Sequence, residues 1–87
     1  MITKDKLKIF STYKGDVDAF AHARSSQRKI VTDEDFFLIN SLIQDIVLVG
    51  KNLASKEFEE NTEKKLLSNC DNQETITELK RLAYSRE

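Results

Sequence analysis

The sequence predicts an all-α fold, an irregular bundle of four to five helices around a central helix at about residues 33–53. The chain contains no proline and two glycines, Gly15 and Gly50. β-Hairpins and tight turns depend on such residues, so the composition disfavours a sandwich or barrel and leaves long helices uninterrupted. Apolar residues recur at helical spacing, and helix-capping residues precede them. The length of 87 residues fits one helical domain, residues 1–87.

Two helices are predicted first along the chain, at about residues 4–14 and 17–24. Thr3 and Asp16 stand where these helices begin, and their side-chain oxygens can accept hydrogen bonds from first-turn N–H groups. Gly15 fits the left-handed position that ends the first helix. The apolar faces are Leu7, Ile9, Phe10 and Tyr13 in the first helix, and Val17, Phe20 and Ala21 in the second.

The segment at 24–29 contains no apolar residue and is expected to be a basic loop. Its positive charges are Arg24, Arg28 and Lys29, which form a candidate patch for an anionic partner. We expect the two apolar residues that follow, Ile30 and Val31, to turn back under the fold.

The central helix has the clearest start. Thr32 and Asp35 form the spacing of a capping box, and the acidic run Asp33-Glu34-Asp35 stands at the positive end of the helix dipole. The apolar stripe is too wide for a peripheral helix, so we expect several neighbours around this one. The stripe consists of Phe36, Ile39, Leu42, Ile43, Ile46, Val47, Val49 and Leu53. The core centre is predicted at Phe36, Ile39, Ile43, Ile46 and Val47.

Two further helices are predicted at about 56–69 and 72–84. Ser55 can cap the first, and Asp71 with Glu74 forms a second capping-box pattern before the other. Glu60 belongs to the solvated side of the first of these helices. The expected inner faces are Phe58, Leu66, Leu67 and Cys70, then Ile76, Leu79, Leu82 and Ala83.

The residues that carry chemistry are few, and we predict no catalytic, cofactor-binding or metal-binding site. His22 is the single histidine, and neither it nor Cys70 has metal-ligand spacing around it. We expect His22 at the surface and Cys70 buried as a small hydrophobe. The run Asp33–Asp35 lacks the alternate ligand positions and the glycine of a calcium loop. No small-molecule ligand is indicated, and the protein is not expected to be an enzyme.

A cytoplasmic location without membrane contact is expected. One cysteine forms no intramolecular disulfide. The residues after Met1 are charged where a signal peptide would be apolar. The apolar runs 36–39 and 46–49 are far shorter than the roughly 20 residues of a membrane helix.

Charge is distributed unevenly along a chain whose net charge is −1. Residues 1–31 carry a net charge of +4, and residues 32–87 carry −5. Two explanations stay open: an anionic partner binds the basic part, or the two parts face each other within the fold.

A second stripe lies on the far side of the central helix, formed by Phe37, Ser41, Gln44 and Leu48. We expect Phe37 and Leu48 to be covered, since a large apolar patch on a small protein is a solubility hazard. Three covers stay open: the first or second helix of this chain, a second copy in a symmetric dimer, or another protein.

The sequence therefore favours a small non-enzymatic protein–protein interaction module, such as an adaptor, a regulatory subunit or an immunity-type inhibitor. Its partner is another protein or a second copy of the chain. The alternative is a nucleic-acid-binding regulator that uses the basic loop at 24–29. Against the alternative stand the carboxylates of Asp33–Asp35 next to that loop and the lack of excess positive charge.

Overall fold

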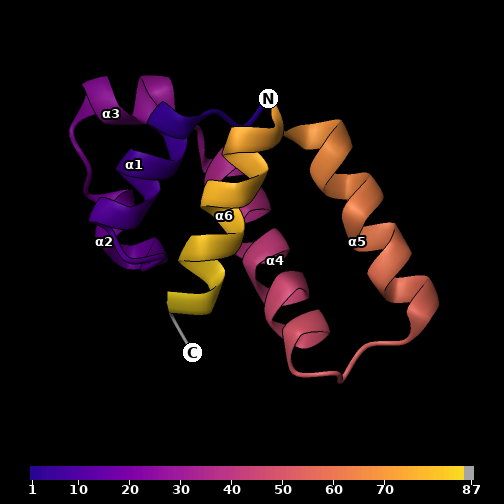
Figure 1. Cartoon of the computed structure of the whole chain (residues 1–87). Helices are drawn as coiled ribbons and strands as arrows, with labels where there is room; N and C mark the ends of the chain where they lie inside the picture. The colour runs from indigo at the N-terminus through magenta and orange to yellow at the C-terminus, as the bar shows by residue number, and fades with distance from the viewer. Residues whose placement is uncertain (86–87) are drawn as a thin grey trace.

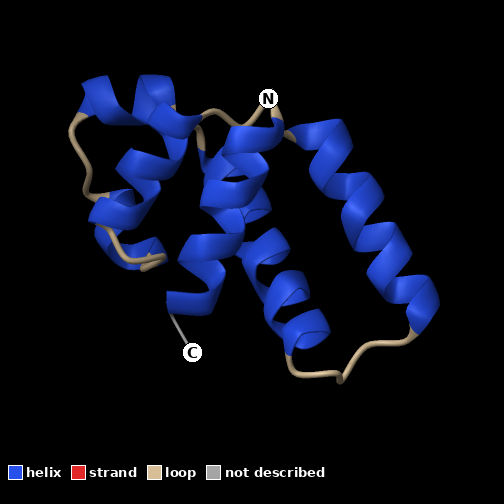
Figure 2. Cartoon of the chain, in the orientation of Figure 1, coloured by secondary structure: helices blue, strands red, loops and turns tan. Residues whose placement is uncertain are grey.

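The computed structural model describes residues 1–85, and these form six α-helices and no strand (Figures 1 and 2). The predicted all-α bundle is confirmed. The helices are α1 (Lys4–Thr12), α2 (Val17–Ala21), α3 (Ser25–Ile30), α4 (Asp33–Gly50), α5 (Lys56–Asn69) and α6 (Gln73–Ser85).

Helix α4 is the centre of the bundle, as its wide apolar stripe predicts. It packs against α1, α5 and α6. In Figure 1, α6 crosses in front of α4, α5 lies to one side, and the three helices α1–α3 gather at the other end. The partners of α4 therefore occupy most of its circumference and leave one face for solvent.

The start of α4 is fixed by the predicted capping box. The Asp35 N–H donates to Thr32 Oγ1 at 3.1 Å, and the Thr32 N–H donates back to Asp35 Oδ2 at 3.2 Å. Two of the N–H groups that would otherwise lack partners at a helix start are thereby satisfied.

The end of α4 lies at Gly50, and this corrects the expected position of Leu53. Asn52 adopts a left-handed conformation with φ of 58°. Its N–H donates to the Val49 carbonyl at 3.1 Å, and the Leu53 N–H donates to the Leu48 carbonyl at 3.0 Å. This pair of bonds is a Schellman motif, which turns the chain away from the helix axis. Leu53 consequently leaves the buried stripe and is 71 % exposed.

The core centres on α4 and an aromatic group at its first turn. The Phe36 ring stacks on Phe20, with centroids 4.3 Å apart, and lies 4.7 Å from the Phe10 ring. These contacts hold α1 and α2 against α4, and aromatic pairs add to the free energy gained by burial. Of the predicted core centre, Phe36, Ile39, Ile43 and Ile46 are buried, whereas Val47 is only half-buried.

Residues before α1 join the fold through backbone pairing that the sequence did not reveal. The Ile2 N–H donates to the Asn69 carbonyl at 2.7 Å, and the Asp71 N–H donates to the Ile2 carbonyl at 3.1 Å. These bonds form an isolated parallel bridge between Ile2 and Cys70, and both side chains are buried. The start of α1 is thus fixed to the junction of α5 and α6.

The expected basic loop at 24–29 is wrong, because residues 25–30 form the helix α3. Its local propensity is weak, and tertiary contacts supply the stability instead. The Arg28 guanidinium donates to the Ala21 carbonyl at 3.2 Å, and the Gln27 side chain is hydrogen-bonded to the Tyr13 hydroxyl. Val31 is buried as expected, but Ile30 is half exposed.

The first two helices are shorter than predicted. Helix α1 ends at Thr12, where Lys14 and Gly15 both adopt positive φ, so the left-handed segment begins one residue before the expected glycine. Helix α2 has the predicted cap, since the Asp16 side chain accepts from two N–H groups, but it ends at Ala21.

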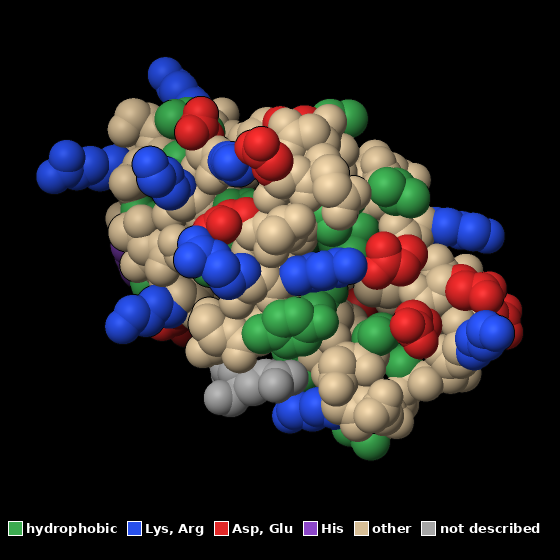
Figure 3. All heavy atoms as spheres, in the orientation of Figure 1, with side chains coloured by type: hydrophobic (Ala, Val, Ile, Leu, Met, Phe, Trp, Pro, Cys, Tyr) green, Lys and Arg blue, Asp and Glu red, His purple; other side chains and the backbone are tan. Residues whose placement is uncertain are grey.

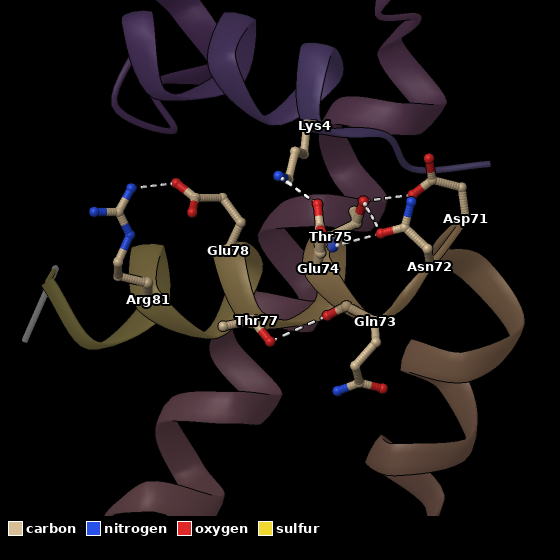
Figure 4. Close-up of polar contacts among 9 residues, drawn as sticks. All are labelled: Lys4, Asp71, Asn72, Gln73, Glu74, Thr75, Thr77, Glu78 and Arg81. Atoms are coloured by element: carbon tan, nitrogen blue, oxygen red, sulfur yellow. Dashed lines mark hydrogen bonds and ion pairs between the residues drawn. The ribbon is translucent and has the colours of Figure 1, made fainter.

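Helix α6 is capped by Asn72 and not by Asp71. The Thr75 N–H donates to Asn72 Oδ1 at 3.0 Å, and the Thr75 hydroxyl contacts the Asp71 carboxylate (Figure 4). On α5, Ser55 caps as predicted, but Leu67 points away from the core and is 65 % exposed. Leu67 lies next to the buried Leu66, and adjacent helical residues do not share a face.

Replacement of Ile43 by alanine should lower the free energy of unfolding by about 2–5 kcal/mol, because it leaves a cavity in the core. The exposed control Glu60→Ala should change it by less than about 0.5 kcal/mol. Chemical denaturation measures both values, and the reverse ranking would contradict the assignment of helix faces.

The capping box should also make stability depend on pH. Burial acts to raise the pKa of Asp35, but hydrogen bonds from the Thr32 N–H and the Lys6 ammonium outweigh it. The pKa of Asp35 therefore lies below its ordinary value of 3.8. Because the folded-state pKa is the lower one, the carboxylate stabilises the fold above the ordinary value, and this contribution is lost as the pH falls through the lowered pKa.

We therefore expect Asp35→Asn to lower the free energy of unfolding by about 1 kcal/mol at neutral pH, and the difference from wild type to shrink in acid. Urea denaturation at a series of pH values measures this. Asp18→Asn is the control, since no ion pair holds Asp18 among residues 1–85. A difference that persists unchanged in acid would contradict the expectation.

Candidate functional site

The outer face of α4 is the candidate site. Phe37, Ser41, Gln44 and Leu48, here called the outer stripe, follow one another at spacings of four, three and four residues. At about 100° per residue, this spacing keeps them within roughly 60° of the helix circumference. All four are exposed, Phe37 by 57 % and Leu48 by 39 %.

The cover expected from the first or second helix of this chain is absent over Phe37 and Leu48 in the structure. Helices α1, α5 and α6 pack on the other sides of α4. Helix α2 lies beside Phe37, but its Phe20 packs on Phe36 and leaves the Phe37 side chain exposed. A second copy or another protein is left as the possible cover.

Further apolar residues extend both ends of the outer stripe. At the Phe37 end, a hollow of about 100 Å³ lies between α2, α3 and α4. The residues that line it are Val17, Phe20, Ala21, Arg28, Asp33, Phe36 and Phe37. At the Leu48 end, the Schellman motif hydrogen-bonds the backbone of exposed Leu53 to Leu48. Sequence reasoning placed Val17 and Leu53 on buried faces, although asparagine at position 52 is a signal for such a helix end.

The three residues of the predicted anionic-partner patch are divided between two roles. Arg28 is paired with Asp33 at 2.9 Å, and its guanidinium lies 5.9 Å from the centroid of the Phe20 ring. Arg24 and Lys29 are exposed at opposite ends of α3. All three side chains are exposed, but the charge of Arg28 is paired with Asp33, and of the three only Arg24 and Lys29 lack an ion pair within residues 1–85.

The two oppositely charged parts of the chain face each other in part. Lys4 pairs with Glu74 at 2.8 Å (Figure 4). Lys6 pairs with Asp35 at 3.1 Å, and Arg28 with Asp33 as above. The hydrogen bond with Glu74 raises the pKa of Lys4 and lowers that of Glu74. Lys and Arg side chains nevertheless gather over the α1–α3 end in the view of Figure 3.

His22 and Cys70, the histidine and the cysteine that could take part in catalysis or metal binding, lie in different parts of the fold. His22 is exposed and ends α2, whereas Cys70 is buried between α5 and α6. Burial raises the pKa of the Cys70 thiol, and the nearby Asp71 carboxylate adds to the effect. The thiol is therefore a packed, protonated group. Across residues 1–85, no group of three His, Cys, Asp or Glu side chains is placed to hold a metal ion.

None of the helices within the described range is long and apolar enough to cross a membrane. No protein-family model matches this chain, and neither a curated protein nor a solved structure shows significant similarity to it.

Substitutions in the outer stripe should leave the fold intact, because these side chains contribute little to the core. We expect Phe37→Ser and Leu48→Ser each to lower the free energy of unfolding by less than about 1 kcal/mol. Phe36→Ala, one residue away from Phe37, should lower it by about 3–5 kcal/mol. Thermal melts followed by circular dichroism measure all three variants, and an unfolded Phe37→Ser variant would show that the stripe belongs to the core.

Proposed function

We propose that the protein is a small non-enzymatic module that binds another polypeptide through the outer stripe of α4. The observation that supports this is the exposure of Phe37 and Leu48 on a helix whose other sides are packed. An aromatic and an aliphatic anchor on one face are typical of binding hot spots, since burial of each against a partner gains free energy.

The polar residues of the stripe suit a specific contact. Ser41 and Gln44 lie between the two apolar anchors and can hydrogen-bond to a partner. A partner helix in the wrong register would leave these groups buried without hydrogen bonds, at a cost of about 1–3 kcal/mol each. The stripe therefore combines apolar affinity with polar selection, as an adaptor, a regulatory subunit or an immunity-type inhibitor requires.

We propose that this module acts in the cytoplasm. The single cysteine is a free, buried thiol, and no disulfide is needed to hold the α5–α6 junction.

The test is affinity capture from the native cell with three versions of the chain. Wild type and the control Leu67→Ser should retain the same partner, because Leu67 is an exposed leucine on α5, away from the stripe. The double variant Phe37→Ser/Leu48→Ser should lose at least about tenfold of the bound partner, since each anchor contributes more than 1 kcal/mol. Equal retention by all three versions would overturn the proposal.

A second candidate function is binding to a nucleic acid through the α1–α3 end. It is favoured by the Lys and Arg side chains that gather there (Figure 3). Arg24 and Lys29 of α3 are both exposed. The pairing of Arg28 with Asp33 and the acidic start of α4 weaken it. If it holds, Arg24→Ala/Lys29→Ala should reduce retention of DNA or RNA in filter binding, and added salt should reduce it steeply. No retention by wild type at low salt would remove this candidate.

A further inference from the structure

We propose that the occupant of the outer stripe is the outer stripe of a second copy, with the two α4 helices antiparallel about a two-fold axis. This rests on the proposed function, because it takes the outer face of α4 to be a protein-binding surface. It adds the identity of the partner and the register of the contact.

The spacing of exposed residues along α4 is the same in both directions. Continued by one step at each end, the stripe comprises Glu34, Phe37, Ser41, Gln44, Leu48 and Lys51, all exposed. The spacings of three, four, three, four and three residues are typical of helices that pack side by side at a shallow angle. A two-fold axis between Ser41 and Gln44 sets each residue against one counterpart: Phe37 against Leu48, Ser41 against Gln44, and Glu34 against Lys51.

Charge decides between the two directions of pairing. In the antiparallel arrangement, Glu34 of each copy faces Lys51 of the other, which gives two attractive pairs. A parallel arrangement sets Glu34 against Glu34 and Lys51 against Lys51, and like charges repel. Neither residue has an ion-pair partner within the 85 described residues. Antiparallel helices also place their dipoles favourably.

The additional apolar residues agree with the same direction. Antiparallel pairing brings the Leu48 end of one copy, with its exposed Leu53, to the Phe37 end of the other. There the hollow lined by Val17, Asp33 and Phe37 offers apolar surface beside the stripe. At each end of the interface, Leu53 of one copy therefore lies near the hollow of the other copy.

The interface is small. The surface from Glu34 to Lys51 is about 26 Å long, and a single helix pair of this length falls at the low end of interface size. We therefore expect a dimer that forms and dissociates with concentration rather than a permanent one. Two-fold homodimers are the commonest closed assemblies, and a self-complementary surface is what they require.

The experiment is analytical ultracentrifugation over a roughly hundredfold range of protein concentration, where mass action shifts a weak dimer. Wild type should approach twice the chain mass of 10.0 kDa at the high end. Phe37→Ser/Leu48→Ser should stay monomeric, and Leu67→Ser should behave as wild type. Circular dichroism confirms that each variant is folded at the temperature used.

Charge reversal tests the register. Glu34→Lys alone and Lys51→Glu alone should each weaken dimerisation by about tenfold, because two symmetry-related pairs become repulsive. The double variant Glu34→Lys/Lys51→Glu should restore it, since the antiparallel pairs become attractive again. In a parallel dimer, each single reversal exchanges one repulsion for another and changes little, so insensitivity to these variants would overturn the proposed geometry.

The outcomes separate this proposal from the one on which it rests. Wild type that stays monomeric at every concentration, while the stripe still captures another protein, overturns the dimer and leaves the binding module. A dimer that persists in Phe37→Ser/Leu48→Ser overturns this interface. If wild type stays monomeric and also captures no protein through the outer stripe, the proposed function is overturned as well.

Discussion

The stacking of Phe36 between α1 and α2 sets the rotation of α4, and the surface of the protein follows from that rotation. The Phe36 ring contacts Phe20 and Phe10 in a site that excludes solvent. Once Phe36 points inward, Phe37 lies about 100° farther round the helix and must point to the outer face. The same rotation sends Ile39, Ile43 and Ile46 into the core. The rotation of α4 therefore determines both which of its residues are buried in the core and which are exposed on the outer stripe.

The three acidic residues at the start of α4 have different contacts. The Asp35 carboxylate accepts from the Thr32 N–H in the capping box and pairs with Lys6, and Asp33 pairs with Arg28. Both carboxylates are thus engaged within the fold, and they hold the basic α1–α3 end against the rest of the chain. Glu34 is exposed and takes part in neither contact. In the proposed dimer, this third carboxylate pairs with Lys51 of the second copy.

Sequence reasoning succeeded where a feature depends on neighbours along the chain. The capping box at Thr32, the Ser55 cap and the buried face of α4 are local patterns, and they predicted the helical bundle. It failed where distant contacts decide. Residues 25–30 become helical because Arg28 and Gln27 reach other elements. Leu53 is exposed because the turn at Asn52 redirects the chain. Phe37 stays exposed although α2 lies beside it, because Phe20 of α2 packs on Phe36.

The bridge between Ile2 and Cys70 has a consequence for the order in which the molecule assembles. It joins two segments separated by nearly the whole chain, so its formation carries a larger loop-closure entropy than the helix contacts formed by neighbours. We therefore expect the bridge to close late in folding and to open early in unfolding. Cys70 is buried beside this bridge, so we expect its thiol to react with a reagent in solution only when this corner of the domain opens, and its reaction rate would measure the frequency of opening.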